Sequence, residues 1–275
     1  MGVLVMTAIL AGAPMYLSSI ESLGLRSTLV TLSASNRNMQ IVVEQLPLTN
    51  SSVSAATERV QVALDELDDL VVTVGQESHT RPHFWATDSK SIVGGLKPDL
   101  AILQRFDNFL DEVDMLEGHE PQSIVLQEET YLVAEVAVPA ERAEELGIGV
   151  GDEIWLSPNP LDPPYLMAKI VGVFHPKDLE AEFWLGLGLE VTEPGRSAPG
   201  ARYMLPLFFT RDGLFNSVTG GAASIGTNRW LIQLDPVLLE RQRPAFTAEQ
   251  VDDVGHALRR GLPESKAITA LENPL

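Results

Sequence analysis

Two histidines four residues apart are the pair in this chain whose spacing best suits metal chemistry. His79 and His83 lie in the segment HTRPHFW, and at this spacing on a helix two histidines can share a zinc ion. Pro82 lies between them and disrupts a helix interior, and no glutamate follows His79 as the metalloprotease motif requires. We therefore interpret the segment as a strand start or turn with surface histidines and a packed Phe84–Trp85 pair, and we predict no metal site.

Two groups of acidic residues could also be taken for cation sites. The first, Asp65-Glu66-Asp68-Asp69, is interpreted as a solvated helix face, because runs of charge usually lie at the surface. The second falls between Asp107 and Glu117. It lacks the alternating ligands, the turn glycine and the closing glutamate that an EF-hand places at fixed offsets. Neither group predicts a bound cation.

Motifs of phosphate binding and covalent catalysis are also missing. The run from Gly220 to Gly226 has no lysine at the Walker position and no Gly-x-Gly-x-x-Gly order, so we interpret it as a flexible connection. The chain has no Gly-x-Ser-x-Gly elbow, and it has no cysteine for thiol catalysis. We predict no catalytic, cofactor-binding or metal-binding residues, and a protein that is not an enzyme.

The composition indicates a folded and strongly acidic chain. Of the 275 residues, 45% are hydrophobic and 21% are charged, and 38 acidic against 19 basic side chains give a net charge of −19. Such a surface repels phosphate backbones, so we expect no nucleic-acid partner. It also disfavours lying on an anionic lipid face. The absence of cysteine is compatible with an extracytoplasmic and with a cytosolic location.

The N-terminal segment is the most informative part of the composition. Met1–Ile20 carries no charge, and a membrane-spanning helix needs about 20 such residues. We expect one complete span here, or the outer part of a span whose beginning is missing. One alternative is a signal peptide cut at Ala11–Ala13, although the basic n-region is missing and Pro14 would follow the cut. Another is an apolar helix buried in a soluble core.

Apolar spacing predicts helices and strands along the rest of the chain. The clearest helix follows an N-cap cluster at Thr49–Ser52 and runs to about Val74. A second amphipathic helix is predicted at Ala248–Leu262. Extended segments are predicted at Met39–Leu48, Asp99–Phe106, Ser123–Gln127, Thr130–Val138, Glu153–Leu156, Met167–Phe174, Tyr203–Thr210 and Arg229–Leu234. Helices that cover sheets in this order predict the α+β class.

The stretch Glu135–Phe174 organises these elements. It reads as strand, short helix, turn, strand, proline-rich excursion and strand. Pro139 suits the first turn of a helix at Ala140–Leu146, because its missing N–H would be unpaired there. Gly147 suits the left-handed residue that ends such a helix.

This stretch resembles the extracytoplasmic domain of MacB/FtsX-type ABC transporter permeases. The matching segments within it are Glu135–Pro139, Glu145–Asp152 and Lys169–Asp178. Looser matches in the family's order are Pro14–Tyr16, Gly24–Arg26, Leu116–Pro121 (with His119 where an arginine is common), Phe183–Trp184 and Trp230–Pro236. The resemblance implies an α+β fold of two lobes, each a mixed sheet with covering helices (a MacB-like periplasmic core domain), after an N-terminal transmembrane and stalk helix.

The resemblance also implies a division of the chain and a function. The division is a transmembrane helix at 1–20, a stalk helix at 21–34, an extracytoplasmic α+β domain at 35–265 with an inserted lobe at about 123–210, and a tail at 266–275 that leads back to the membrane. The implied function is mechanotransmission from a partner ATPase to export, lipoprotein handling or cell-wall regulation. The implied partners are a cytoplasmic ATP-binding subunit, membrane lipid, and a second permease half or a homodimer, with the bulk of the chain outside the cell membrane.

Two other functions stay open from the residues alone. One is a secreted or anchored hydrolase or ligand-binding protein behind a signal peptide. The other is a soluble double-barrel module that uses Glu135–Phe174 for packing only.

Overall fold

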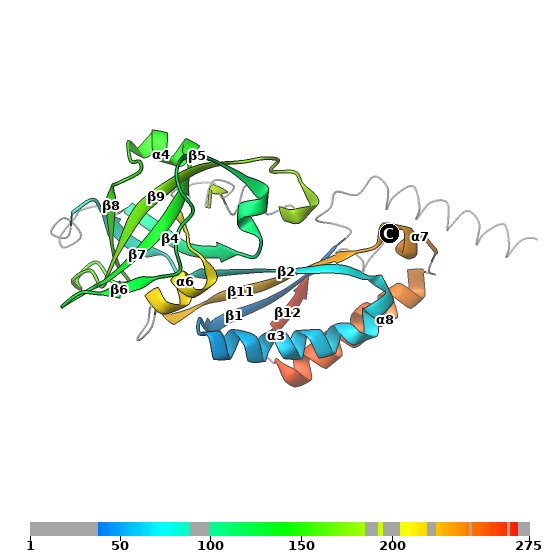
Figure 1. Cartoon of the computed structure of the whole chain (residues 1–275). Helices are drawn as coiled ribbons and strands as arrows, with labels where there is room; N and C mark the ends of the chain where they lie inside the picture. Colours follow the sequence, from blue (N-terminus) through cyan, green and yellow to red (C-terminus); the bar gives the residue numbers. More distant parts are fainter. Residues whose placement is uncertain are drawn as a thin grey trace, which may run out of the picture.

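The computed structural model describes residues 38–88, 99–184, 192–194, 204–218, 224–241, 244–262 and 265–268. The transmembrane helix expected at 1–20, the stalk helix expected at 21–34 and most of the glycine-rich run after Gly220 lie outside these residues. The described part is a 12-stranded mixed sheet with covering helices (Figure 1), which agrees with the expected mixture of helices and strands.

The expected helices and strands are present with shifted ends, and the structure adds strands and helices that the sequence did not predict. The strands are β1 (Met39–Pro47), β2 (Val71–Thr80), β3 (His83–Ala86), β4 (Asp99–Phe106), β5 (Val113–Gly118), β6 (Val125–Gln127), β7 (Leu132–Pro139), β8 (Glu153–Ser157), β9 (Leu166–Pro176), β10 (Leu205–Phe208), β11 (Ile225–Leu234) and β12 (Ser265–Ile268). The α-helices are α3 (Asn50–Leu64), α4 (Ala140–Leu146), α6 (Arg211–Ser217), α7 (Pro236–Arg241) and α8 (Pro244–Gly261). Short 3-10 helices lie at Asp65–Leu70, Phe109–Glu112 and Glu182–Trp184.

Part of the sheet closes into a barrel, which we call the barrel lobe. Strands β4, β10, β7, β9, β8 and β3 pair in turn, and β3 pairs back with β4. The pairs β4–β10 and β7–β9 are parallel and the others are antiparallel. β5 and β6 extend the barrel by pairing with β9 and β7. The buried residues of these strands, such as Leu103, Val136, Ile154 and Ile170, form one apolar core.

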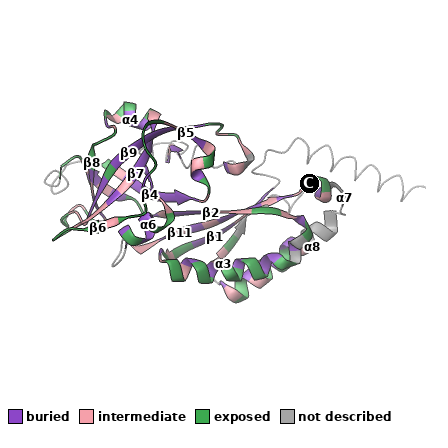
Figure 2. Ribbon diagram, in the orientation of Figure 1, coloured by how far each residue is buried: buried purple, intermediate pink, exposed green. Residues whose placement is uncertain are grey.

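The remaining strands form an open sheet, which we call the helix-covered sheet. β4 pairs with β2 at its C-terminal end, and β2, β11, β1 and β12 then follow in order. Helices α3 and α8 lie across one face (Figure 1), and the core between them includes Ile41, Val60, Trp230 and Leu258. Figure 2 shows that the outer sides of both helices carry exposed residues. Burial of this apolar face holds the helices to the sheet.

Helix α3 begins as the sequence predicts and ends earlier. Thr49 caps it, since its hydroxyl accepts the N–H of Ser52 at 3.2 Å. The helix was expected to reach about Val74, but its α-helical part ends at Leu64, a 3-10 helix follows, and β2 starts at Val71. The physical reason is tertiary, because β2 pairs with β11 along its length and the valines at its start suit a pleated strand.

The stretch Glu135–Phe174 forms β7, α4, β8 and β9 as expected. Gly147 ends α4 with a φ of 65°, the left-handed conformation that glycine adopts without strain. At Gly172, a Cβ atom would lie 2.6 Å from the carbonyl oxygen of His119. This glycine therefore allows the segment after β5 to pass closely over β9.

Two boundaries differ from the expected division. The lobe expected at about 123–210 also includes β3 and β4, which close the barrel upstream of residue 123. Residues 266–268, expected in the tail, belong to β12 and pair with β1. The reason in both cases is that backbone groups at a strand edge require partners, and these segments supply them.

Candidate functional site

The junction between the barrel lobe and the helix-covered sheet is the candidate site. β4 pairs with β10 and β3 in the barrel and with β2 from Gln104 to Phe106. The register places Ser78 of β2 opposite Arg105 of β4, and Asn228 of β11 opposite Ser78. Since directly opposed residues on neighbouring strands share a face, these three side chains form a row across the junction.

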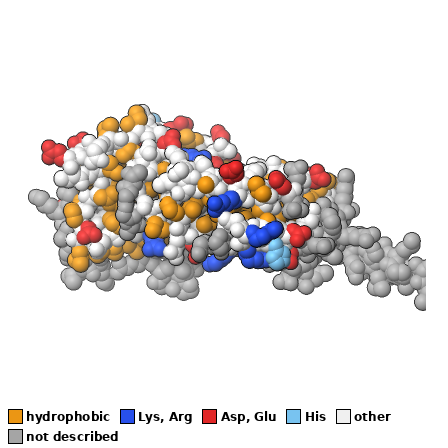
Figure 3. All heavy atoms as spheres, turned by 90° about the horizontal axis from the view of Figure 1, so that it is seen from below, with side chains coloured by type: hydrophobic (Ala, Val, Ile, Leu, Met, Phe, Trp, Pro, Cys, Tyr) orange, Lys and Arg blue, Asp and Glu red, His pale blue; other side chains and the backbone are white. Residues whose placement is uncertain are grey.

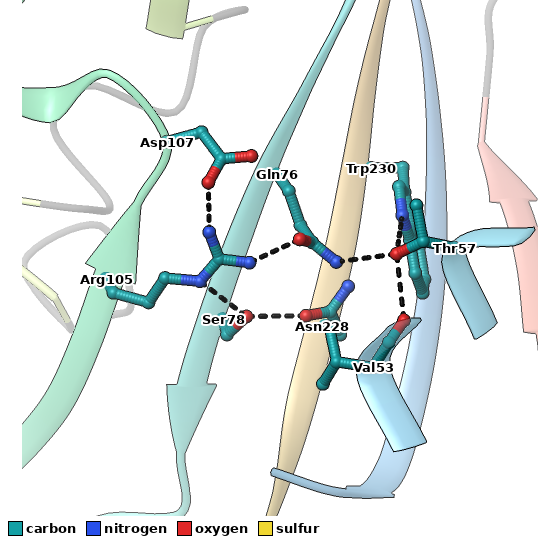
Figure 4. Close-up of polar contacts among 8 residues, drawn as sticks. All are labelled: Val53, Thr57, Gln76, Ser78, Arg105, Asp107, Asn228 and Trp230. Carbon is teal, nitrogen blue, oxygen red and sulfur yellow. Dashed lines mark hydrogen bonds and ion pairs between the residues drawn. The ribbon is translucent and has the colours of Figure 1, made fainter. Parts of the chain in front are cut away.

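The guanidinium of Arg105 connects the strands of this row. The residue is 1% exposed, and its Nε donates to Ser78 Oγ at 3.1 Å while its Nη2 donates to Gln76 Oε1 at 2.5 Å. Its Nη1 donates to the carboxylate of Asp107 (Figure 4). Ser78 Oγ in turn donates to Asn228 Oδ1 at 2.5 Å. One arginine therefore joins β4 to β2, and through Ser78 to β11.

The hydrogen bonds continue to helix α3 through Thr57. Gln76 Nε2 and Trp230 Nε1 each donate to Thr57 Oγ1 at 3.2 Å, and Thr57 Oγ1 donates to the carbonyl of Val53 at 2.8 Å (Figure 4). This hydroxyl accepts two hydrogen bonds and donates one, which is its full capacity. A continuous chain of hydrogen bonds thus runs from the barrel strand β4 to the helix that covers the open sheet.

Burial disfavours the charge of Arg105, and a neighbouring carboxylate partly offsets this effect. Burial lowers the pKa of its guanidinium, the carboxylate of Asp107 opposes this effect, and the positive charge of Arg211 adds to it. The guanidinium also lies 5.6 Å from the ring centroid of Phe215, with that of Arg211 at 5.8 Å from the same ring. A guanidinium remains charged in proteins, so the junction contains a buried cation held by a carboxylate, neutral acceptors and an aromatic ring.

This arrangement can position strands, but it is poorly suited to proton transfer. Arginine donates hydrogen bonds and does not act as a base at ordinary pH. The hydroxyl of Ser78 donates to the amide oxygen of Asn228 rather than to a basic group. Most polar atoms of this buried network are paired, although Asn228 Nδ2 has no hydrogen-bond partner among the described residues. Breaking any one of the bonds would leave a further polar group unsatisfied in a low-dielectric interior, so the network favours one geometry.

The structure gives the two histidines separate partners. His79 Nδ1 lies 2.6 Å from Glu77 Oε1. His83 was expected at the surface and is instead buried, because β3 pairs on both sides and its alternate residues face the barrel core. Its Nδ1 lies 2.8 Å from the Arg81 carbonyl and its Nε2 lies 3.1 Å from the Tyr165 hydroxyl. Burial lowers the pKa of His83 to about 4 and raises that of Tyr165.

The other residues that the sequence analysis considered as sites lie at the surface or contribute to packing and ion pairs. Asp65 and Asp69 are exposed, as a solvated face requires. Asp107, from the second acidic group, is the partner of Arg105. Within the described ranges, no three His, Cys, Asp or Glu side chains are grouped so that they could hold a metal ion. Trp184 is fully buried and packs against Phe106, with ring centroids 5.4 Å apart, so it is a core anchor as expected.

Sequence reasoning missed Arg105 and its partners. The sequence predicts an extended segment at Asp99–Phe106 without singling out its arginine, and Gln76 and Ser78 lie just beyond the helix expected to reach about Val74. The arginine itself was a signal, because a charged side chain in an otherwise apolar strand needs hydrogen-bond partners if it is buried. The identity of those partners depends on the register of β2 and β11.

Basic side chains gather on the face that carries α3 and α8 (Figure 3). Arg259 and Arg260 lie in the last turn of α8, and Arg59 of α3 donates to the carbonyl of Gly261 at 3.0 Å. Lys266 of β12 pairs with Glu44 at 3.4 Å. Cations at the end of a helix compensate its dipole, so Arg259 and Arg260 favour the C-terminus of α8, and Arg59 ties that end to α3.

No helix in the described part of the chain is long and apolar enough to cross a membrane. No protein-family model matches the sequence, and no curated protein matches it. Among solved structures, the periplasmic region of MacB from Actinobacillus actinomycetemcomitans is similar, with a TM-score of 0.41 and 12% sequence identity over 86% of this chain and 90% of that chain. At this level the likeness does not assign the chain to a family.

Proposed function

We propose that this chain is the extracytoplasmic portion of an ABC transporter permease and that it acts without chemistry of its own. A cytoplasmic ATP-binding subunit would supply the motion. The N-terminal segment would contact membrane lipid, and a second permease half or a second copy would complete the transporter. The proposal rests on the order of the sequence segments that resemble MacB/FtsX-type permeases. Three of them, Glu135–Pro139, Glu145–Asp152 and Lys169–Asp178, come together in one unit of β7, α4, β8 and β9.

The hydrogen-bonded junction at Arg105 is the observation that carries the mechanism. A protein that passes on a movement needs its parts to shift as rigid bodies. The Arg105 network joins β4 of the barrel lobe to β2, β11 and α3 on one face of the sheet. On the other face, Leu231 of β11 belongs to the same apolar cluster as Phe174 of β9 and Phe208 of β10. A movement of the helix-covered sheet would therefore carry the barrel lobe with it as one rigid body.

The location can be tested by cysteine labelling, because the chain contains no cysteine of its own. In cells of the source organism that express the full gene product, Leu161→Cys introduces a thiol at a side chain that is 78% exposed. We expect a membrane-impermeant maleimide to label it in intact cells. Ser157→Cys is the matched control, since Ser157 is fully buried and its replacement should react only after denaturation. Labelling of Leu161→Cys only after cell lysis would contradict the extracytoplasmic location.

The partner can be tested with the same cells. A tagged chain solubilised in mild detergent should co-purify with an ATP-binding subunit and with ATPase activity that vanishes when the Walker lysine of that subunit is replaced. A chain that is recovered without any ATP-binding protein, and that turns over a substrate unaided, would favour the secreted alternative.

The mechanical role can be tested by a distance measurement within the complex. Spin labels at Val62→Cys on α3 and Leu161→Cys in the barrel lobe report the relation of the two lobes; the side chains at these positions are 64% and 78% exposed. We expect a narrow distance distribution that stays the same with and without trapped nucleotide. Arg105→Met and the milder Thr57→Val should broaden it, because each interrupts the network. A broad distribution in the parent protein, or no effect of either variant, would refute rigid coupling.

A further inference from the structure

A cavity of about 310 Å³ lies on the opposite face of the junction from the Arg105 network. Side chains alternate between the two faces of a strand, so Glu77 and His79 of β2 point away from the side on which Gln76 and Ser78 lie. They line the cavity together with polar residues of β4, β11 and the β2–β3 turn, which are Arg81, Gln104, Thr227 and Arg229. Its apolar wall includes Pro82, Ile102 and Met204.

Glu77 lines this cavity, and one oxygen of its buried carboxylate lacks a hydrogen-bond donor among the described residues. The residue is 1% exposed. Its Oε1 lies 2.6 Å from His79 Nδ1, while its Oε2 has no hydrogen-bond partner among the residues that the structure describes. Arg229 Nε lies 3.9 Å from Oε2, which is an ion-pair distance but too long for a hydrogen bond. A buried carboxylate oxygen without a donor is costly, so this position favours a ligand that brings an N–H or O–H group.

The charges around the cavity narrow the class of ligand. One carboxylate, Glu77, and two guanidinium groups, Arg81 and Arg229, line the same space. A simple amine would satisfy Glu77 but would face two positive charges. A simple anion would meet the two guanidinium groups but would leave the carboxylate without a donor. A molecule that carries both an ammonium and an anionic group satisfies both sides.

We propose that this cavity binds a small zwitterion, an α-amino acid with an aliphatic side chain. Its ammonium would donate to Glu77 Oε2, its carboxylate would lie between the guanidinium groups of Arg81 and Arg229, and its side chain would pack on Ile102 and Met204. The volume is at the lower end of the range of small-molecule sites, which suits a ligand of this size. This inference stands apart from the transport proposal, because it depends only on the cavity.

Thermal shift and calorimetry on the purified protein test the chemistry of the ligand. A panel of the common amino acids should include aliphatic members that raise the melting temperature, and leucine should give a saturable heat of binding. Two leucine analogues separate the charges: 3-methylbutan-1-amine lacks the carboxylate, and 4-methylpentanoate lacks the amine. Each should bind about tenfold or more weakly than leucine, the loss expected for one charged hydrogen bond. The proposal is overturned if no amino acid binds at millimolar concentration, or if either analogue binds as well as leucine.

Variants test the residues. Glu77→Gln keeps the shape and the acceptor for His79 but removes the charge, and it should weaken leucine binding by about tenfold or more. Arg81→Gln changes an exposed residue and should also weaken leucine binding. It tests the proposal even if Glu77→Gln fails to fold. Arg59→Gln on α3 is the matched control and should bind as the parent does. Leucine binding that is unchanged in a folded Glu77→Gln or in Arg81→Gln would place the ligand elsewhere and overturn the assignment.

Discussion

Acidification is expected to destabilise this protein through the buried side chain of His83. Burial lowers its pKa from 6.5 to about 4. The neutral imidazole fits its site, since Nδ1 donates to the Arg81 carbonyl and Nε2 accepts from the Tyr165 hydroxyl. As the pH falls below 6.5, the histidine of the unfolded chain takes up a proton while that of the folded chain does not. The unfolded state therefore binds more protons between pH 6.5 and about 4, and the free energy of unfolding decreases as the pH falls through this window.

The size of the effect follows from the two pKa values. The gap between 6.5 and about 4 corresponds to about 3 kcal/mol, at about 1.4 kcal/mol for each pH unit. About 2 kcal/mol of this is lost by pH 5, where the unfolded histidine is almost fully protonated and the folded one is not. Because a typical domain is stable by only about 5–15 kcal/mol, this one side chain accounts for a measurable part of the total.

Urea unfolding at pH 7 and pH 5, followed by tryptophan fluorescence, measures this loss. The parent protein should lose about 2 kcal/mol more than His83→Asn between the two pH values, because the titration of the carboxylates is common to both proteins. Tyr165→Phe is the control: it removes the hydroxyl but keeps the imidazole buried, so it should retain most of the acid sensitivity. Equal losses in the parent and in His83→Asn would refute the argument that a buried neutral histidine causes the effect.

Two further predictions concern stability. Arg105→Met should lower the free energy of unfolding by about 1–3 kcal/mol for each buried acceptor, such as Gln76 Oε1, that loses its donor; urea titration measures this, and a variant as stable as the parent would contradict it. Gly226→Ala should cost about 1–3 kcal/mol, because its Cβ would lie 2.2 Å from the carbonyl oxygen of His79. Gly149→Ala, which meets nothing within 4 Å, is the matched control in the same titration and should unfold as the parent does.

Local features of the fold were predictable from the sequence, because their causes lie within a few residues. The hydroxyl of Thr49 caps α3 and Gly147 ends α4 in the left-handed conformation, both as their residue types indicate. Alternating or continuous apolar residues located the strands, including Asp99–Phe106 as β4. The start of β2 was not predicted, because the spacing of its valines continues the helical period. Only the pairing of β2 with β11 distinguishes a strand from a helix there.

The sequence by itself determined many of the helices and strands, and that the chain is acidic and rich in apolar residues. The tertiary structure alone decided that β4 closes a barrel on one side and joins an open sheet on the other. It also decided that Arg105 meets Gln76 and Ser78, and that Glu77 lines a cavity with Arg229. The physical reason is that capping and periodicity act between near neighbours in the chain. The pairing of β2 with β11 depends instead on residues about 150 positions apart, and the contacts of Arg105 with Ser78 and Gln76 join residues 27 and 29 positions apart.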